Sequence, residues 1–224
     1  MGISILEPEG LSVLRTPGDY LADLVNRGAF YSIPLVDWTT AFSGSGAAYV
    51  VPALLFLSTG ATVSSVARAY GEANFSHGVT GTSKFNYDKD FRLILSIYRY
   101  ISLATAIARI QIKAVTTEGV LANKGIGIQI RTLTLVGESY GTSLATTGSQ
   151  VLTNDKLYHL EIRYSAGASI KWYVDRVLLA TQSTAANIPS GTATGQMVFS
   201  IINGATATDA GLGISGSIIF WQED

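Results

Sequence analysis

The stretch LYHLEIRYSAGASIKWYVDRVLLAT, residues 157–181, decides the fold of this chain. Apolar and polar side chains alternate within residues 157–164 and again within residues 170–174. Alternation with a period of two is the pattern of a β-strand that buries one face. Small residues at 165–169 and the pair Asp175-Arg176 interrupt the alternation, and a third apolar run follows. The stretch therefore predicts three strands joined by two short turns, which form an antiparallel meander.

The chain after Pro34 repeats this pattern. Strand-like segments recur at residues 92–98, 108–113, 126–131, 197–202 and 218–221. Leu133 and Leu135 fall on the opposite parity from the apolar residues before them, which predicts a bulge or an edge crossing near Thr132. Many short strands with glycine-rich breaks predict an all-β fold, an antiparallel two-sheet β-sandwich of the jelly-roll type.

The first thirty-five residues differ from the rest. Thr16 is suited to cap a helix, Pro17 to occupy its first position and Asp19 to lie in its first turn. We expect residues 1–35 to form an N-terminal arm with this short helix, and residues 36–224 to form the jelly-roll sandwich. The arm would pack either on its own domain or on a neighbouring subunit.

Composition excludes several classes of protein. Charged residues make up 14% of the chain and the net charge is −1, so the basic signature of a nucleic-acid-binding protein is absent. A near-neutral, apolar chain favours association. No apolar run reaches the roughly 18–20 residues that span a bilayer, and residues 1–9 lack the pattern of a secretory signal. The lack of cysteine excludes disulfides and zinc–thiolate sites. We expect no nucleic-acid partner and no membrane span.

The meander also resembles the penultimate hairpins of concanavalin A-like lectin and glucanase domains, a superfamily that includes laminin-G-like modules. The likeness lies in the strand YHLEIRY, which starts at Tyr158, and in a second strand that ends Tyr173-Val174-Asp175. The chain departs from the pattern at Arg176, where glycine or asparagine is usual, and a bulky residue at positive φ is costly. The resemblance covers about residues 155–224 and implies the sandwich fold. Its members include lectins, glycosidases and virus structural proteins, so the fold alone does not assign a function.

The catalytic signature of the glycosidases in that superfamily is missing. They carry acids as E-x-D-x-x-E on one strand, because retaining hydrolysis needs two carboxyl groups about 5–5.5 Å apart. Asp88 and Asp90 are the closest acids at strand spacing, and we interpret them as a solvated strand entrance. His77 is interpreted as a loop residue and His159 as an outward strand residue. The string GESYG at 137–141 matches G-x-S-x-G, but the sequence predicts no helix after it.

Metal binding is not expected either. Asn86, Asp88 and Asp90 offer oxygen atoms at alternate positions, but the full pattern of a calcium-binding loop is missing. We predict no catalytic residue, no metal site and no cofactor.

Aromatic side chains are the better candidates for ligand contact. Sugar rings stack on exposed aromatic faces, and Tyr140 lies in a glycine-rich stretch while Tyr173 points away from Trp172. Tyr140 and Tyr173 are therefore the candidate ligand-binding residues, whereas Trp172 and Trp38 are assigned to the core. Exposed aromatic rings serve protein interfaces equally well.

These observations favour a non-enzymatic structural protein that forms a homo-oligomer. A capsid, decoration or appendage component of a virion fits them, with a virion or extracellular location. The alternative is a carbohydrate-binding, lectin-like module or adhesin on the same fold, and a glycoside hydrolase is third. The expected partners are further copies of this chain and glycans.

Overall fold

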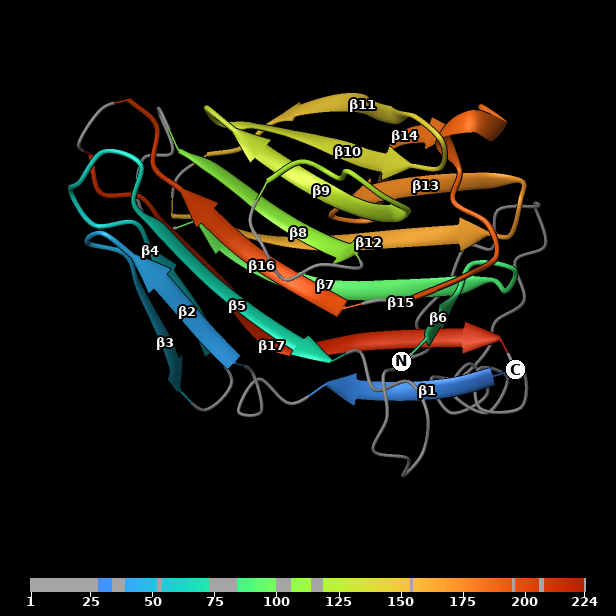
Figure 1. Cartoon of the computed structure of the whole chain (residues 1–224), viewed down its shortest axis with the longest axis horizontal. Helices are drawn as coiled ribbons and strands as arrows, with labels where there is room; N and C mark the ends of the chain where they lie inside the picture. The colour runs from blue at the N-terminus through green and yellow to red at the C-terminus, as the bar shows by residue number, and fades with distance from the viewer. Residues whose placement is uncertain are drawn as a thin grey trace, which may run out of the picture.

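The structure, a computed structural model, is an all-β sandwich. It describes residues 28–33, 39–51, 54–72, 84–99, 106–113, 119–153, 155–194, 196–205 and 208–223. Two large sheets form the layers, and all their strand pairs are antiparallel. In Figure 1 the seven-stranded sheet lies over the eight-stranded sheet. The two-sheet sandwich predicted from the sequence is confirmed.

The eight-stranded sheet contains the predicted meander. Its order is β14 (Val177–Gln182), β13 (Ser169–Val174), β12 (Leu157–Ser165), β7 (Phe91–Arg99), β17 (Gly211–Glu223), β4 (Leu54–Ser58) and β3 (Ala47–Val51), with β1 (Gly28–Ile33) also paired to β17.

The seven-stranded sheet has the order β11 (Leu144–Val151), β10 (Thr134–Tyr140), β9 (Gly125–Arg131), β8 (Ile107–Lys113), β16 (Gln196–Ile202), β5 (Val66–Glu72) and β2 (Thr39–Ser43). A separate ribbon pairs β15 (Thr192–Thr194) with β6 (Lys84–Asn86). The helical content of the described residues is one 3-10 turn, η2 (Ala185–Asn187). No helix in the described ranges is long and apolar enough to cross a membrane.

The expected N-terminal helix falls within residues 1–27, which lie outside the described residues. Residues 28–33, which also belong to the segment expected to form an arm, make β1 and pair with the last strand, β17.

The tight turn after β13 forms despite Arg176. Val174 lies opposite Val177, and Asp175 and Arg176 have φ angles of 49° and 69°. Two central residues at positive φ are the signature of the hairpin turn that matches strand twist. Asp175 is anchored there because its Oδ1 accepts the backbone N–H of His159 at 2.9 Å.

A second turn of this kind accounts for the change of parity near Thr132. Thr132 and Leu133 have φ angles of 47° and 77°, and Arg131 lies opposite Thr134. The bulge or edge crossing expected at this point is instead a two-residue hairpin between β9 and β10. The bulges of this region lie elsewhere, for example between Leu135 and Gly137 in the pairing of β10 with β11.

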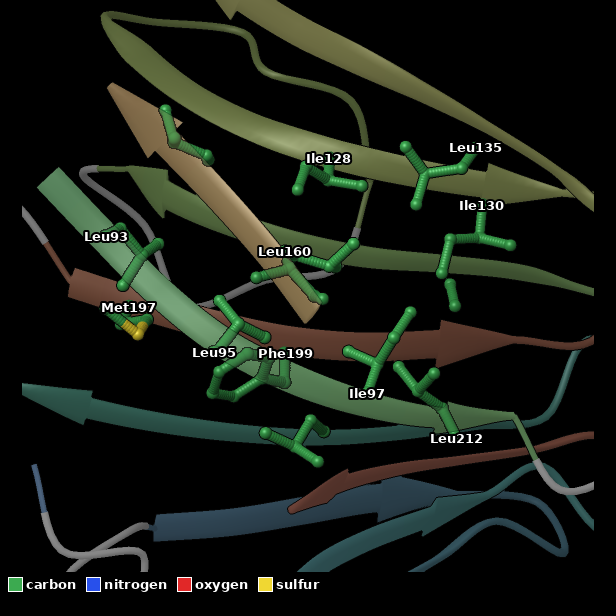
Figure 2. Packing of buried hydrophobic residues seen from close by; sticks show 14 of the residues in the cluster. Leu93, Leu95, Ile97, Ile128, Ile130, Leu135, Leu160, Met197, Phe199 and Leu212 are labelled. Carbon is green, nitrogen blue, oxygen red and sulfur yellow. The ribbon is translucent and has the colours of Figure 1, made fainter. Parts of the chain in front are cut away.

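The core fills the space between the two sheets. Figure 2 shows side chains from β7, β12 and β17 of the eight-stranded sheet packing against side chains from β9, β10 and β16 of the seven-stranded sheet. Trp172 is fully buried, as predicted, and its Nε1 donates to the carbonyl of Gly127 in the opposite sheet at 2.9 Å. A Cβ on Gly137 would lie 2.5 Å from the indole, so only glycine leaves room for that ring. Trp38, the other predicted core tryptophan, lies outside the described residues.

Candidate functional site

The outer face of the seven-stranded sheet carries a cluster of buried polar side chains. On β8 the apolar residues point into the sandwich, so Arg109, Gln111 and Lys113 point outward. Register places Ser200 of β16 beside Arg109, and Glu138 of β10 lies on the same face. None of the five side chains is more than 5% exposed. Charged residues are rarely buried to this degree, so this polar cluster is the candidate site.

Gly127 makes the cluster possible. Gln111 on β8 and Glu138 on β10 both lie opposite Gly127 on the strand between them. A Cβ on Gly127 would lie 2.8 Å from the Cγ atom of Gln111. Because that position carries no side chain, Gln111 crosses β9, and its Nε2 donates to Glu138 Oε2 at 2.8 Å.

Glu138 also attracts Arg109. Glu138 Oε1 lies 3.6 Å from Arg109 Nε, an ion-pair distance that is too long for a hydrogen bond. Burial raises the pKa of the Glu138 carboxyl, while the hydrogen bond from Gln111 and the charge of Arg109 oppose that rise. Burial also lowers the pKa of the Arg109 guanidinium, and Glu138 opposes that change. The two charges therefore compensate each other only in part.

Four atoms of the cluster have no hydrogen-bond partner. They are Arg109 Nε, Gln111 Oε1, Glu138 Oε1 and Ser200 Oγ. A buried polar atom without a partner costs about 1–3 kcal/mol, and such atoms are uncommon in native proteins. The set includes one donor, two acceptors and a hydroxyl that does both. The set therefore matches a chemical group that both donates and accepts hydrogen bonds.

Residues 119–124 cover part of the cluster. The carbonyl of Gly119 accepts Gln111 Nε2 at 3.1 Å and Lys113 Nζ at 3.4 Å. Leu121 is buried over β9, and its Cδ2 would lie 2.8 Å from a Cβ on Gly125. The hydrogen bonds to Gln111 and Lys113 thus fix the position of this segment over the cluster.

The side of this face toward β11 is more open. Tyr140 and Gln129 are half-buried, while Arg131 and Thr146 are exposed, and Leu144 is 42% exposed. Thr146 lies opposite Glu138, and Leu144 lies opposite Tyr140. An aromatic ring and an apolar side chain therefore stand beside the buried polar cluster.

The two tyrosines predicted to bind a ligand are not brought together. Tyr140 lies on the outer face of β10, two residues from Glu138. Tyr173 lies on the outer face of the eight-stranded sheet, where the Arg163 guanidinium is 4.3 Å from its ring centre. Arg163 is held there by Glu161, with an Nε–Oε1 distance of 2.6 Å. The binding role of both tyrosines remains a prediction, and Tyr140 is the one beside the polar cluster.

The acids, the asparagine and the histidine that the sequence excludes from catalytic and metal-binding roles make structural contacts. Asp88 Oδ1 accepts the N–H of Gly191 at 2.7 Å, and Asp90 Oδ1 accepts the N–H of Ala166 at 2.8 Å. Asn86 Oδ1 accepts the N–H of Asp88. His159 is exposed and its Nδ1 lies 2.8 Å from the Ser96 hydroxyl. His77 lies outside the described residues.

Sequence reasoning missed the cluster. The alternation at residues 108–113 predicts a half-buried strand with Arg109, Gln111 and Lys113 on its polar face, and Glu138 belongs to no catalytic or metal-binding motif. One usable signal is Glu138 itself, an acid inside a strand whose neighbours are apolar or small. The matching signal is glycine at alternate positions of β9, Gly125 and Gly127, which leaves space for side chains from the adjacent strand.

The cluster contains a single carboxylate. Among the side chains described on this face, Glu138 is the acidic one, and no group of three or more His, Asp or Glu able to hold a metal occurs in the described residues. Hydrolysis by the two-carboxylate route needs a second acid. The chemistry that this arrangement offers is hydrogen bonding and charge.

No family model matches the chain, and no curated protein matches it. Solved structures do share its fold. The Emp47p carbohydrate recognition domain has a TM-score of 0.61 at 12% identity, over 87% of this chain and 96% of that one. The endo-β-1,4-glucuronan lyase of the fungus Trichoderma reesei has a TM-score of 0.59 at 9% identity, over 86% of this chain and 94% of that one.

A third similar structure is a botulinum neurotoxin type C, whose cell entry depends on interaction with two ganglioside molecules. Its TM-score is 0.56 at 13% identity, over 89% of this chain and 49% of that one. The chain therefore has the concanavalin A-like jelly-roll fold, which confirms the resemblance seen in the meander. Proteins with this fold include both carbohydrate-binding domains and glycan-acting enzymes, and identities this low show the fold alone.

Proposed function

We propose that this domain is a non-enzymatic carbohydrate-binding module whose glycan lies on the outer face of the seven-stranded sheet. The observation that carries the proposal is the set of four buried polar atoms without a hydrogen-bond partner. A sugar hydroxyl accepts from one group and donates to another, so a single hydroxyl satisfies Arg109 Nε and Glu138 Oε1 together. The solved structures that share this fold include a carbohydrate recognition domain, which supports the proposal of carbohydrate binding.

The exposed part of the face supplies the remaining contacts. The half-buried ring of Tyr140 and the side chain of Leu144 offer apolar surface for a pyranose ring. Aromatic side chains provide large contact areas for little loss of conformational entropy. The single carboxylate argues for binding without hydrolysis.

Two serines provide a matched test. Ser200 and Ser139 are both fully buried, and the hydroxyls of both lack partners. Ser200 points outward beside Arg109, whereas Ser139 lies opposite Ile126 and faces the core. Glycan binding is measured by array screening and then by calorimetry on the best ligand. Ser200→Ala should weaken binding about fivefold to tenfold, the value of one hydrogen bond, and Ser139→Ala should not. Equal effects from both variants, or no glycan bound by the wild type, would contradict the proposal.

A homo-oligomeric structural subunit, such as a virion component, is the second candidate. It is favoured by a row of apolar side chains across the other outer face, made by Tyr49, Phe56, Tyr98 and Leu157. These residues lie in register on successive strands, and Gly213 of β17 stands between Phe56 and Tyr98. Tyr49 is 59% exposed and Leu157 is 43% exposed. Exposed apolar patches of this kind mark association surfaces.

Light scattering after size exclusion tests the second candidate. A defined oligomer that dissociates on Tyr49→Asp would support assembly through this row. Deletion of residues 1–27, which keeps β1, tests the contribution of the N-terminal segment. A monomer in the wild type would rule assembly out and leave the carbohydrate-binding module.

A further inference from the structure

β2 is an edge strand whose sequence lacks the usual protection of an edge. Within the described residues it pairs with β5 on one side, so it is the outermost strand of the seven-stranded sheet (Figure 1). Edge strands present backbone N–H and C=O groups to other strands, and proteins usually block them with charges, proline or a bulge. Residues 39–43 read TTAFS, and their pairing with β5 has no shift in register. Four of the five residues are exposed, so β2 has the properties of a strand that another strand can join.

Phe42 points to the core side of the sheet and yet is exposed. It lies opposite Ala67 of β5, as Thr40 lies opposite Ala69. Both alanines are fully buried in the core, and residues directly opposite each other in a sheet share a face. Phe42 is nevertheless 64% exposed. The apolar layer between the two sheets therefore ends at an aromatic ring that one copy of the chain leaves largely in contact with solvent.

The opposite side of the sandwich is closed. Its edge strands are β11 and β14, and the pairing of each with its neighbour contains a shift in register. The two edges also pack on each other, because a Cβ on Gly148 of β11 would lie 2.7 Å from the Cβ atom of Ala180 on β14. Leu179 and Ala180 pack against the core. Bulges and packing therefore protect that side, whereas the pairing of β2 with β5 is regular up to the edge.

We propose that β2 pairs with β2 of a second copy of this chain, antiparallel and around a two-fold axis. Overlap of the whole strand centres the axis on Ala41, so that Phe42 lies opposite Thr40 of the second copy and Thr39 lies opposite Ser43 of the second copy. No like charges meet, because the strand has no charged residue. Hydrogen bonds between Thr and Ser and contacts of aromatic with β-branched side chains stabilise antiparallel pairs. A two-fold contact uses the same surface on both copies, and β2 is complementary to itself in this way.

The pairing also covers the exposed ring. Diagonal neighbours in an antiparallel pair lie about 7–8 Å apart, within reach of aromatic side chains. With Ala41 on the axis, the two Phe42 side chains are diagonal neighbours on the same face. Each ring covers the other and extends the apolar layer of its own sandwich. An unrelated strand would satisfy the backbone groups without supplying this second ring, which is why the occupant is a second copy.

The pairing has a consequence for the outer face of the seven-stranded sheet. A two-fold axis perpendicular to the joined sheets keeps their outer faces on the same side. The polar clusters of the two copies therefore face the same way, and two linked sites bind a multivalent surface more tightly than one site does. This consequence rests on the proposed carbohydrate binding, whereas the pairing itself does not.

Light scattering after size exclusion, over a range of concentrations of the full-length chain, measures the pairing. The wild type should have twice the mass of one chain. Phe42→Asp and Thr40→Lys should each raise the dissociation constant at least about tenfold, because each brings two like charges close across the axis and the first also removes the rings. Val151→Asp on β11 is the matched control, because Val151 is 68% exposed on the protected edge. It should leave the dimer intact.

A mixture of the two weakened variants tests the register. In a dimer of one Phe42→Asp chain with one Thr40→Lys chain, the introduced carboxylate lies opposite the introduced ammonium, and neither like-charge pair forms. Mixing should therefore restore dimers that contain one chain of each variant, which a purification tag on one of them detects. Circular dichroism checks that both variants are folded. If Phe42→Asp unfolds, Phe42→Ser replaces it in the dissociation measurement, and an unchanged dissociation constant there would count against the proposal.

The other outcomes are distinct. A wild type that is monomeric at every concentration would overturn the pairing, and so would a mixture that forms no dimer. Dissociation by Tyr49→Asp but not by Phe42→Asp would move the contact to the outer face of the eight-stranded sheet. Dissociation by Val151→Asp alone would move it to the opposite edge. Glycan binding has its own measurement, so a monomer that binds glycan refutes the pairing alone, and a dimer that binds none refutes the carbohydrate-binding proposal alone.

Discussion

Gln111 on β8 reaches across the neighbouring strand β9 and donates to Glu138 on β10 at 2.8 Å. The two residues are separated by 27 positions in the sequence and by one whole strand in the sheet. The contact exists because Gly127, which lies between them, has no side chain. The candidate site therefore depends on a glycine that contributes no side chain to it.

Replacing Gly127 should disrupt this contact. A Cβ at position 127 would lie 2.5 Å from the Ile110 carbonyl oxygen and 2.8 Å from Gln111 Cγ. Gly127→Ala should lower the free energy of unfolding by about 1–3 kcal/mol, through crowding and the displaced hydrogen bond. Urea denaturation measures the change. Gly213→Ala on β17 is the control, because the nearest atoms to its Cβ lie at 3.4 Å. Equal losses in both variants would contradict this role for Gly127.

The pH dependence of stability should carry the signature of Glu138. Burial raises the pKa of this carboxyl in the folded protein. A group that binds its proton more tightly when folded stabilises the protein fully below its unfolded pKa, about 4.3, and loses that contribution as pH rises through the folded value. As pH rises from the unfolded pKa of Glu138 through its folded pKa, the wild type should lose more stability than Glu138→Gln does. Urea denaturation at a series of pH values gives the difference between the two, and parallel curves would contradict the prediction.

Tyr140 and Tyr173 should respond differently to truncation. Tyr140 stands beside the polar cluster, and Tyr173 lies on the other outer face against Arg163. Tyr140→Ala should weaken glycan binding about tenfold, which corresponds to ~1.4 kcal/mol. Tyr173→Ala should leave the affinity unchanged. A loss confined to Tyr173→Ala would move the binding surface to the eight-stranded sheet.

The turn after β13 should accept a glycine with a gain in stability. Arg176 has a φ of 69°, a conformation that costs a side-chain-bearing residue about 1–2 kcal/mol relative to its preferred one. Arg176→Gly should therefore raise the midpoint of thermal unfolding. Asp175→Gly is the comparison, because it gives up the hydrogen bond from the His159 N–H and the ion pair with Lys156. A higher unfolding midpoint for Asp175→Gly, with no change for Arg176→Gly, would contradict the prediction that the backbone of Arg176 is strained.

The sequence predicts the fold better than the site because the two depend on different distances along the chain. Strand alternation is local, so the meander and the buried position of Trp172 follow from a few neighbouring residues. The turn at Thr132-Leu133 was harder, since neither residue favours positive φ. The cluster depends on strand order: β16 must lie between β5 and β8 before Ser200 can stand between Arg68 and Arg109. Nothing in the local pattern around residue 200 indicates that neighbourhood.

The hydrogen bond from Trp172 to Gly127 has an experimental consequence. Trp172 is the tryptophan whose side chain the structure describes, and its indole N–H bonds to the carbonyl of the residue that lies between Gln111 and Glu138. Indole emission responds to changes in the dipoles and hydrogen bonds around the ring. A ligand that binds Gln111 or Glu138 should therefore change the surroundings of this indole. Trp172 thus lies behind the proposed binding face, and its emission is a label-free signal to compare with and without added glycan, against a Trp172→Phe control.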